Sequence, residues 1–187
     1  MKNTYILLLL LVANSFADSS VAIQDAMISY RDKLSQSPST PQGITKVPNK
    51  TTSKISLYDE CFDDASIKYS IPSNLLRSIA RVESKMKPDA INFNKNGSFD
   101  VGIMQINSTW FPRLARVGIQ RGELLDGCKN IQVGAWILSQ NVKRYGLTAE
   151  AIGRYNSPNP YYKARYVRLV LAEYNRTKKQ QLSLASN

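Results

Sequence analysis

Residues Ile71–Trp110 read IPSNLLRSIARVESKMKPDAINFNKNGSFDVGIMQINSTW. Apolar side chains recur in the first half of this segment at intervals of three and four, which is typical of a helix with one buried face. The pattern predicts a helix that starts at Pro72 and Ser73 and ends near Met86. The same spacing places Glu83 on the apolar edge of this helix, in its last turn.

The position of Glu83 predicts a raised pKa for its carboxyl group. Partial desolvation and the negative end of the helix dipole both disfavour the anion. A carboxylic acid that is still protonated near neutral pH is what a general acid must be. A single glutamate in a helix is usually a solvated or ion-paired surface residue, however, and Arg81, Lys85 and Lys87 are close enough in sequence to be partners. Glu83 alone therefore does not carry a functional prediction.

A polar loop of turn-forming residues follows Glu83-Ser84 and leads into the run Gly102–Asn107. Together these residues closely resemble the active-site segment of the lysozyme-like superfamily. Within it they are most similar to SLT-type lytic transglycosylases, of the specialised kind that accompanies type III or type IV secretion, conjugation and pilus machines. A third motif, Tyr155-Asn156, follows at the expected distance, although Arg154 replaces the usual small residue before it. The resemblance covers roughly residues 57–176.

The resemblance implies a role for each matching residue. Glu83 corresponds to the catalytic acid, and the third motif closes the site from its far side. Tyr155 is expected to pack its ring in the cleft wall with its hydroxyl near Glu83, orienting the acid; a purely structural ring is the alternative. The expected substrate-binding residues are Ser84, Gly102, Met104, Gln105, Asn107, Tyr155 and Asn156. Gln105 and Asn107 carry amides suited to N-acetyl groups, but either amide can instead satisfy loop backbone, and Met104 can belong to the core.

The implied reaction is cleavage of peptidoglycan between N-acetylmuramic acid and N-acetylglucosamine. Protonated Glu83 donates to the glycosidic oxygen, the substrate's N-acetyl group stabilises the cation, and Glu83 then removes the proton of the muramyl 6-hydroxyl. The product is a 1,6-anhydro sugar. Asp100, 17 residues after Glu83, matches the second carboxylate of animal lysozymes. As a candidate second carboxylate it keeps a water-using muramidase open, while a turn aspartate that caps backbone amides is the structural alternative. A glycan-binding scaffold with a vestigial site is the third hypothesis.

The N-terminal residues predict export. Residues 1–17 have a basic start, a short apolar run and small residues before Asp18, which is typical of a secretory signal peptide rather than a membrane span. No Cys follows the cleavage site, so neither a lipid anchor nor another stable membrane anchor is expected. Residues 18–34 have the spacing of a short amphipathic helix, and the Ser-, Thr- and Pro-rich residues 35–54 are predicted to be a flexible linker. The mature protein is expected in the periplasm.

The remaining residues predict one domain, over residues 55–176, followed by a basic and polar tail at 177–187. The expected fold is mainly α, a lysozyme-like α domain of the α+β superfamily. A small β-hairpin is expected between Lys95 and Ile106, beside the active-site cleft. Helical spacing predicts further helices from Leu57 to Tyr69, over 109–117 with Val117 inward, over 131–145 ending at Gly146, after Thr148 as N-cap, and over 161–178.

Two residue counts restrict the chemistry. The chain has two cysteines, Cys61 and Cys128, and in an exported chain these predict one disulfide; two buried free thiols are the alternative. Histidine is absent, which excludes Ser-His-Asp and Cys-His hydrolases and most zinc enzymes. No metal and no cofactor are therefore expected, and glycoside cleavage is the large class of reactions that needs carboxylates alone.

The positive charge is concentrated in the C-terminal part. Of the net charge of +11, residues 108–187 contribute 13 Lys and Arg against 4 Asp and Glu. A basic surface suits an anionic polymer, so peptidoglycan glycan strands are the expected partner, with components of a secretion, conjugation or pilus machine as further candidates. A solvated face that aids solubility is the alternative. Nucleic acid is not expected, because the signal peptide would remove the protein from it.

Overall fold

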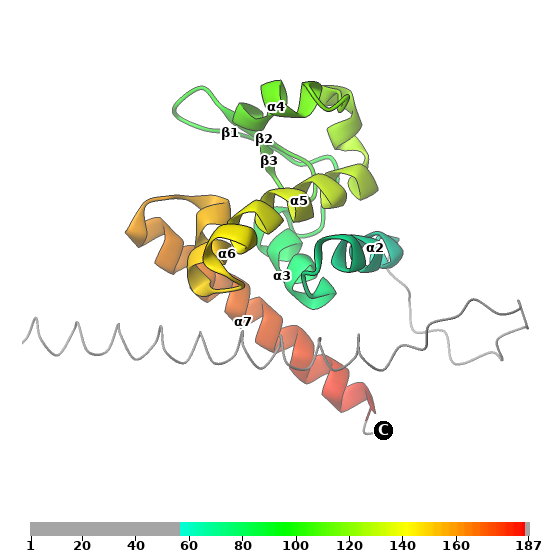
Figure 1. Ribbon diagram of the computed structural model, residues 1–187. Coiled ribbons are helices and arrows are strands. Elements are labelled where there is room, and N and C mark those ends of the chain that lie inside the picture. Colours follow the sequence, from blue (N-terminus) through cyan, green and yellow to red (C-terminus); the bar gives the residue numbers. More distant parts are fainter. Residues whose placement is uncertain (1–56, 186–187) are drawn as a thin grey trace, which may run out of the picture.

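The computed structural model describes residues 57–185, so the predicted signal peptide and the N-terminal segment 18–54 lie outside the described residues. The described part is mainly helical with one small sheet, as the sequence predicts (Figure 1). Its elements, in chain order, are α2 (Asp59–Tyr69), α3 (Ser73–Ser84), β1 (Ile91–Phe93), β2 (Phe99–Val101), β3 (Ile106–Asn107), the 3-10 helix η1 (Ser108–Trp110), α4 (Phe111–Ala115), the 3-10 helix η2 (Arg121–Leu125), α5 (Gly127–Tyr145), α6 (Ala149–Asn156) and α7 (Pro160–Ala185).

Helix α3 carries Glu83 in its last turn, as predicted. Its apolar face is buried, and Leu76 and Ile79 are completely inaccessible to solvent. The helix ends at Ser84, two residues before the predicted end, because Lys85 and Met86 both adopt positive φ values of 56° and 68°. This left-handed stop places Glu83 at the edge of the core and not in the middle of a longer helix.

Helix α5 runs through the centre of the molecule, with α2 and α6 against it, while α7 packs on α3 and α6 (Figure 1). Its predicted end at Gly146 is confirmed, with φ of 69° at that residue. Asp126 caps the start of α5 by accepting a hydrogen bond from the backbone N–H of Lys129 at 2.7 Å. Thr148 caps α6 as predicted, accepting from the N–H of Ala151.

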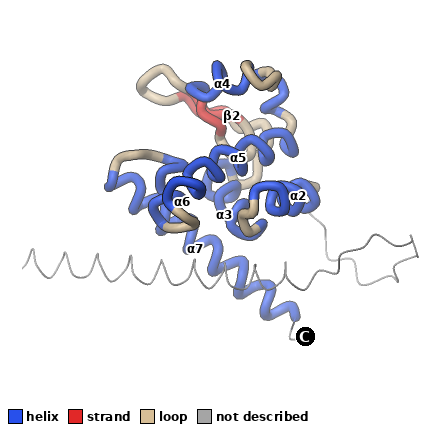
Figure 2. The backbone as a smooth tube through the Cα atoms, in the orientation of Figure 1, coloured by secondary structure: helices blue, strands red, loops and turns tan. Residues whose placement is uncertain are grey.

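The predicted hairpin is present and belongs to a three-stranded antiparallel sheet. Ile91 of β1 pairs with Val101 of β2, and Asp100 of β2 pairs with Asn107 of β3. The sheet and α4 lie together on one side of α5 (Figure 2). The bounds predicted for the hairpin, Lys95 to Ile106, fit β2 and β3. Strand β1 lies before these bounds and was not predicted, because a strand of three residues is too short for a readable alternation.

Two predictions about short segments are wrong. The helix expected over 109–117 is divided into η1 and α4, and Val117 is 66% exposed because α4 ends at Ala115. Leu57, expected on the first helix, precedes α2 and is 83% exposed. Helix α7 is longer than predicted and continues to Ala185, through most of the expected tail. Its last turns extend beyond the other helices (Figure 1).

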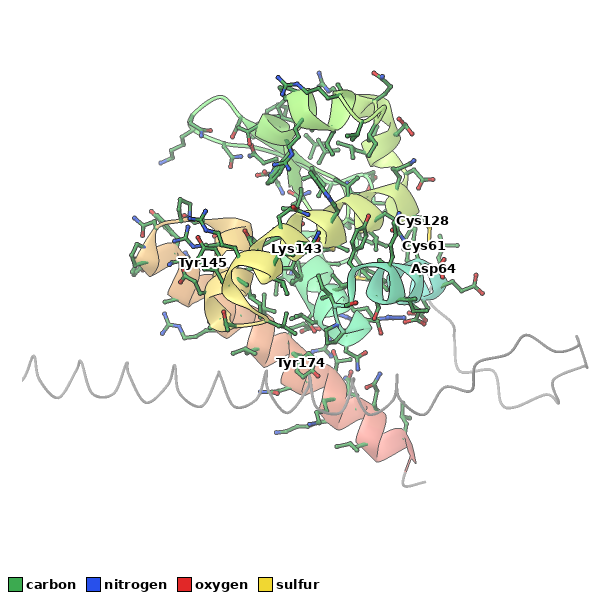
Figure 3. All side chains as sticks on the ribbon, viewed as in Figure 1. Cys61, Asp64, Cys128, Lys143, Tyr145 and Tyr174 are labelled. Atoms are coloured by element: carbon green, nitrogen blue, oxygen red, sulfur yellow. A yellow bond between two sulfur atoms is a disulfide. The ribbon has the colours of Figure 1, made fainter. Side chains whose placement is uncertain are left out.

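The predicted disulfide is present. Cys61 of α2 and Cys128 of α5 are joined, with their Cα atoms 5.3 Å apart (Figure 3). Within residues 57–185, none of the helices has both the length and the apolar character needed to cross a membrane.

Candidate active site

A polar cleft of about 800 Å³ lies between the sheet and the α6–α7 turn. Glu83 of α3 opens into it, together with Asp100 and Asn107 of the sheet and Tyr155 of α6. The structure thus brings together residues from all three sequence motifs. Its other lining residues are Asn94, Lys95, Asn96, Ser98, Gln105, Ile106, Thr109, Trp110, Ile137, Asn156, Ser157 and Tyr162.

The carboxyl group of Glu83 is partly buried and accepts a hydrogen bond at 2.5 Å from the hydroxyl of Tyr166. The pKa of Glu83 is raised from its ordinary value of 4.5 to about 7. Burial is the largest cause, the hydrogen bond from Tyr166 lowers the pKa, and the charge of Asp100 raises it. The nearby cation Arg81 pairs with Glu173 at 3.4 Å instead. A large fraction of Glu83 is therefore protonated at neutral pH, as a general acid requires.

Tyr166 is the residue that sequence reasoning missed. It lies on the buried face of α7 with Val167 and Val170, and it is only 5% exposed. A sequence signal for this residue does exist: Tyr166 lies beside Val167 and Val170 on the face of the helix that is expected to be buried. A buried tyrosine hydroxyl needs a hydrogen-bond partner. Helix α3, which packs on α7, supplies that partner as Glu83.

Tyr155 lines the same cleft as Glu83, but its hydroxyl is bonded elsewhere. It donates to the carbonyl oxygen of Met104 at 2.8 Å, and the hydroxyl that donates to Glu83 is that of Tyr166. The ring of Tyr155 lines the cleft as predicted. Burial, together with the charges of Glu83 and Asp100, raises its pKa well above the ordinary value, so the phenol stays neutral.

The loop Gly102–Asn107 is held by a residue outside the three motifs. Asn130 of α5 is fully buried, and its Oδ1 accepts from the N–H of Met104 at 2.8 Å. Its Nδ2 donates to the carbonyl oxygens of Val101 and Leu124 at 2.9 and 2.8 Å. Gly102 has φ of 81°, and a Cβ at this position would collide with the amide of Asn130. Gly102 is thus needed for the shape of the loop.

Three of the expected substrate-binding side chains support the loop instead. Met104 is fully buried and packs on Gly134, so it belongs to the core. The Oγ of Ser84 donates to the carbonyl oxygen of Ile103 at 2.8 Å, which ties the end of α3 to the loop. The amide of Gln105 donates to the carbonyl of Gly102 at 2.8 Å and accepts from the Nδ2 of Asn92 in β1 at 2.6 Å. For Met104 and Gln105 this is the structural alternative named above, and Gln105 also lines the cleft.

Asp100 lies in β2 and holds two amides of the cleft wall. Its Oδ1 accepts from Nδ2 of Asn107 at 2.7 Å, and its Oδ2 accepts from Nδ2 of Asn94 at 2.8 Å. The alternative of a turn aspartate that caps backbone amides is wrong, because its partners are side chains across the sheet. Asn107 also accepts from the N–H of Thr109 at 3.0 Å, capping η1.

The third motif forms the opposite wall. Asn156 is exposed and lines the cleft at the end of α6. Arg154, which replaces the usual small residue, bonds Glu150 at 2.5 Å and lies 4.7 Å from the ring centroid of Tyr145. This side chain is therefore accommodated outside the cleft, and it leaves the motif intact.

Comparison with known proteins agrees with this geometry. The transglycosylase SLT domain family matches residues 60–165, which is more than half of the chain. The chain belongs to this family. Membership confirms the prediction of a peptidoglycan lytic transglycosylase and its lysozyme-like fold.

Relatives of this SLT protein occur in Salmonella typhimurium and Shigella flexneri. It is 39% identical over 140 residues to "Invasion protein IagB" of Salmonella typhimurium, which covers 68% of this chain and 88% of IagB. It is 40% identical over 99 residues to "Protein IpgF" of Shigella flexneri, covering 52% of this chain and 65% of IpgF. Among solved structures, an inactive mutant of lytic transglycosylase Slt from Pseudomonas aeruginosa has the same fold, with a TM-score of 0.54 and 20% identity, covering 68% of this chain and 24% of Slt.

Proposed function

We propose that this SLT protein cleaves the β-1,4 bond between N-acetylmuramic acid and N-acetylglucosamine in peptidoglycan and leaves 1,6-anhydro-muramyl ends. The observation that carries the proposal is the carboxyl of Glu83, which opens into the cleft with a pKa raised to about 7 and a hydroxyl bonded to it. Glu83 is its proposed catalytic residue.

Glu83 acts first as an acid and then as a base. The protonated carboxyl donates its proton to the glycosidic oxygen as the bond to C1 of the muramyl residue breaks, which releases the glucosamine end. The substrate's own N-acetyl group stabilises the positive charge that develops at C1. Glu83, now a carboxylate, removes the proton of the muramyl 6-hydroxyl, whose oxygen bonds to C1. The carboxyl is thereby protonated again, and no water is consumed.

The bonding of Asp100 fits a positioning role in this route. Both of its oxygens accept hydrogen bonds from cleft amides, those of Asn94 and Asn107. We therefore assign Asp100 the tasks of positioning these amides and raising the pKa of Glu83. A water-using muramidase and a glycan-binding scaffold remain the outcomes against which the proposal is tested.

Peptidoglycan lies outside the cytoplasm, so we place the protein in the periplasm, to which the predicted signal peptide of residues 1–17 would direct it. Its likeness to an invasion protein and its resemblance to enzymes of conjugation, type III secretion and pilus systems support a role in opening the wall locally for an envelope-spanning apparatus. Components of such a machine are the proposed protein partners.

The deciding experiment is mass spectrometry of muropeptides released from purified sacculi. Anhydro ends are expected from the parent chain and no release from Glu83→Gln. The Slt structure similar to this chain is of an inactive mutant in which glutamate is replaced by glutamine, so that protein also depends on a glutamate. Reducing ends would establish the muramidase, and the absence of any release from the parent would establish the scaffold.

Asp100→Asn is the second test. If the N-acetyl group stabilises the cation, this variant should keep most of its rate, because an asparagine still bonds one of the two amides. A loss on the scale of Glu83→Gln would contradict the role that we assign to Asp100.

A further inference from the structure

Two neighbouring tyrosines are exposed at the start of α7, and one of them, Tyr162, lines the cleft. Tyr161 is 68% exposed and Tyr162 is 52% exposed, so neither ring serves the core. The Oδ1 of Asn159 accepts from the N–H of Tyr161 at 3.0 Å, which fixes the first turn of the helix. The two rings meet edge to face with centroids 5.4 Å apart. Large exposed rings held in a fixed position are suited to contact with a ligand.

The helix repeat places Tyr162 beside the proposed acid. Tyr162 and Tyr166 are four residues apart, so they lie on the same face of α7, separated by about 6 Å along its axis. Tyr166 bonds Glu83, and Tyr162 lines the cleft at the next turn toward the N-terminus of α7. Tyr161, about 100° away around the helix, is outside the set of lining residues. The adjacent tyrosines therefore differ in their access to the cleft.

The opposite wall of this part of the cleft is the tip of the β1–β2 hairpin. Asn94, Lys95 and Asn96 are exposed there and line the same cleft as Tyr162. The hairpin tip and the α6–α7 turn project on the same side of the molecule (Figure 1). One wall thus offers hydrogen-bonding groups and the other the ring of Tyr162.

We propose that Tyr162 stacks against one N-acetylhexosamine ring of the bound glycan, in a subsite next to the bond that is cleaved. A pyranose has an apolar face of C–H groups and a polar edge of hydroxyl and acetamido groups. The ring of Tyr162 can stack on the apolar face, and the polar side chains of the hairpin tip can form hydrogen bonds with the polar edge. Tyr162 is therefore a substrate-binding residue outside the sequence motifs, and this inference rests on the proposed function.

The test measures binding without turnover. In a Glu83→Gln background, the affinity for the hexamer of N-acetylglucosamine is measured by isothermal titration calorimetry. Tyr162→Ala is expected to weaken binding about threefold to tenfold. Tyr162→Phe should bind like its parent, because stacking needs the ring and not the hydroxyl. Tyr161→Ala is the matched control: it removes a ring that contacts Tyr162 but does not line the cleft, so its loss of affinity should be smaller than that of Tyr162→Ala.

The proposed subsite would be refuted if Tyr162→Ala bound the hexamer as tightly as its parent, or if Tyr161→Ala lost as much affinity as Tyr162→Ala. In the chain that retains Glu83, Tyr162→Ala should raise KM for sacculi at unchanged kcat, and a fall in kcat alone would also overturn it. The two proposals fail separately. If the parent chain forms anhydro ends but Tyr162→Ala has the same KM as the parent, only the subsite is refuted. If binding of the hexamer depends on Tyr162 but the parent chain releases no muropeptides from sacculi, only the proposed reaction is refuted.

Discussion

The carboxyl of Glu83 is subject to two opposing influences that together set its pKa. Burial and the negative charge of Asp100 favour the neutral acid, whereas the hydroxyl of Tyr166 favours the anion by donating to it. The balance, at about 7, suits a group that must give up a proton and take one back within a single turnover. Tyr166 therefore both orients the acid and keeps its pKa from rising too far.

Activity should follow this pKa. The rate for the parent chain is expected to fall as the pH rises above about 7, because the proton donor is lost. Tyr166→Phe removes the hydrogen bond that lowers the pKa of Glu83, so the alkaline limb should move to higher pH, with a rate reduced on the order of tenfold by poorer orientation. The measurement is the pH profile of muropeptide release from sacculi.

Tyr174→Phe is the control for Tyr166→Phe, because Tyr174 also lies on α7 but is outside the set of cleft-lining residues. It should leave the profile unchanged. A shift of the alkaline limb to lower pH in Tyr166→Phe, or the same shift in both variants, would refute the role of Tyr166.

The stability of Glu83→Gln should depend on pH. The pKa of Glu83 is raised on folding, so the stability linked to its neutral form is fully present below 4.5 and is lost as the pH rises through about 7. Glutamine stays neutral throughout. Above pH 7 the variant should therefore be more stable than the parent, by up to the order of 3 kcal/mol, with little difference near pH 4. Urea denaturation at both pH values measures this, and an equal difference at the two would contradict a raised pKa.

The sequence predicted Glu83 but not its partner, for a physical reason. Glu83 could be placed by counting along one helix, since both the apolar face and the carboxyl belong to α3. Its bond to Tyr166 joins residues 83 positions apart, and it depends on how α7 packs against α3. The same holds for Asn130, whose side chain bonds the end of β2, the loop that follows it and the 3-10 helix η2, because helical spacing along α5 does not reveal these partners.

At the scale of elements, the site depends on a loop with almost no regular structure of its own. The side chain of Asn130 in α5 forms hydrogen bonds with three backbone groups around Gly102–Asn107, and the side chain of Ser84 in α3 bonds a fourth. Because these backbone groups are buried, each would be costly without its partner. The two helices thus shape the loop that holds Asp100 and Asn107 at the cleft.

Gly102→Ala should destabilise the protein much more than Gly97→Ala. Both glycines have φ near 80°, so both substitutions strain the backbone, at about 1 kcal/mol. At Gly97 a new Cβ meets nothing within 4 Å, whereas at Gly102 it collides with the buried amide of Asn130. The loss for Gly102→Ala is expected to exceed that for Gly97→Ala by about 2 kcal/mol or more. Urea denaturation of both variants measures this, and equal losses would show that the loop does not need Asn130 in this position.

Helices were predictable where apolar spacing or a cap marked them, as in α3, α5 and α6, and the shortest helices were not. The 3-10 helix η2 at Arg121–Leu125 is too short to have a period. Helix α7 continues beyond its expected end. This extension could not be predicted, because its last turns have no buried apolar stripe that would appear as a sequence pattern. Leu182 and Leu184 there are 62% and 77% exposed.

At the scale of the whole molecule, the cleft and the disulfide lie in separate parts of the fold. The cleft is built by α3, the sheet, α6 and α7, with Ile137 from α5. The disulfide joins α2 to the first turn of α5, and neither cysteine lines the cleft. The cross-link closes a loop that contains α3, the sheet and both 3-10 helices, so it constrains most of the active-site segment without contacting it.

Removal of the disulfide should therefore lower stability and spare catalysis. A cross-link between residues 67 positions apart stabilises a protein by about 4 kcal/mol in the chain-entropy model, since it restricts the unfolded chain. The Cys61→Ser and Cys128→Ser double variant is expected to unfold on the order of 10–20 °C below the parent. At temperatures where both are folded, the two should release anhydro-muropeptides at similar rates, because every lining residue keeps its contacts. An unchanged midpoint would mean that the cross-link adds no stability, whereas a folded but inactive variant would mean that α2 sets the position of Glu83 through α3.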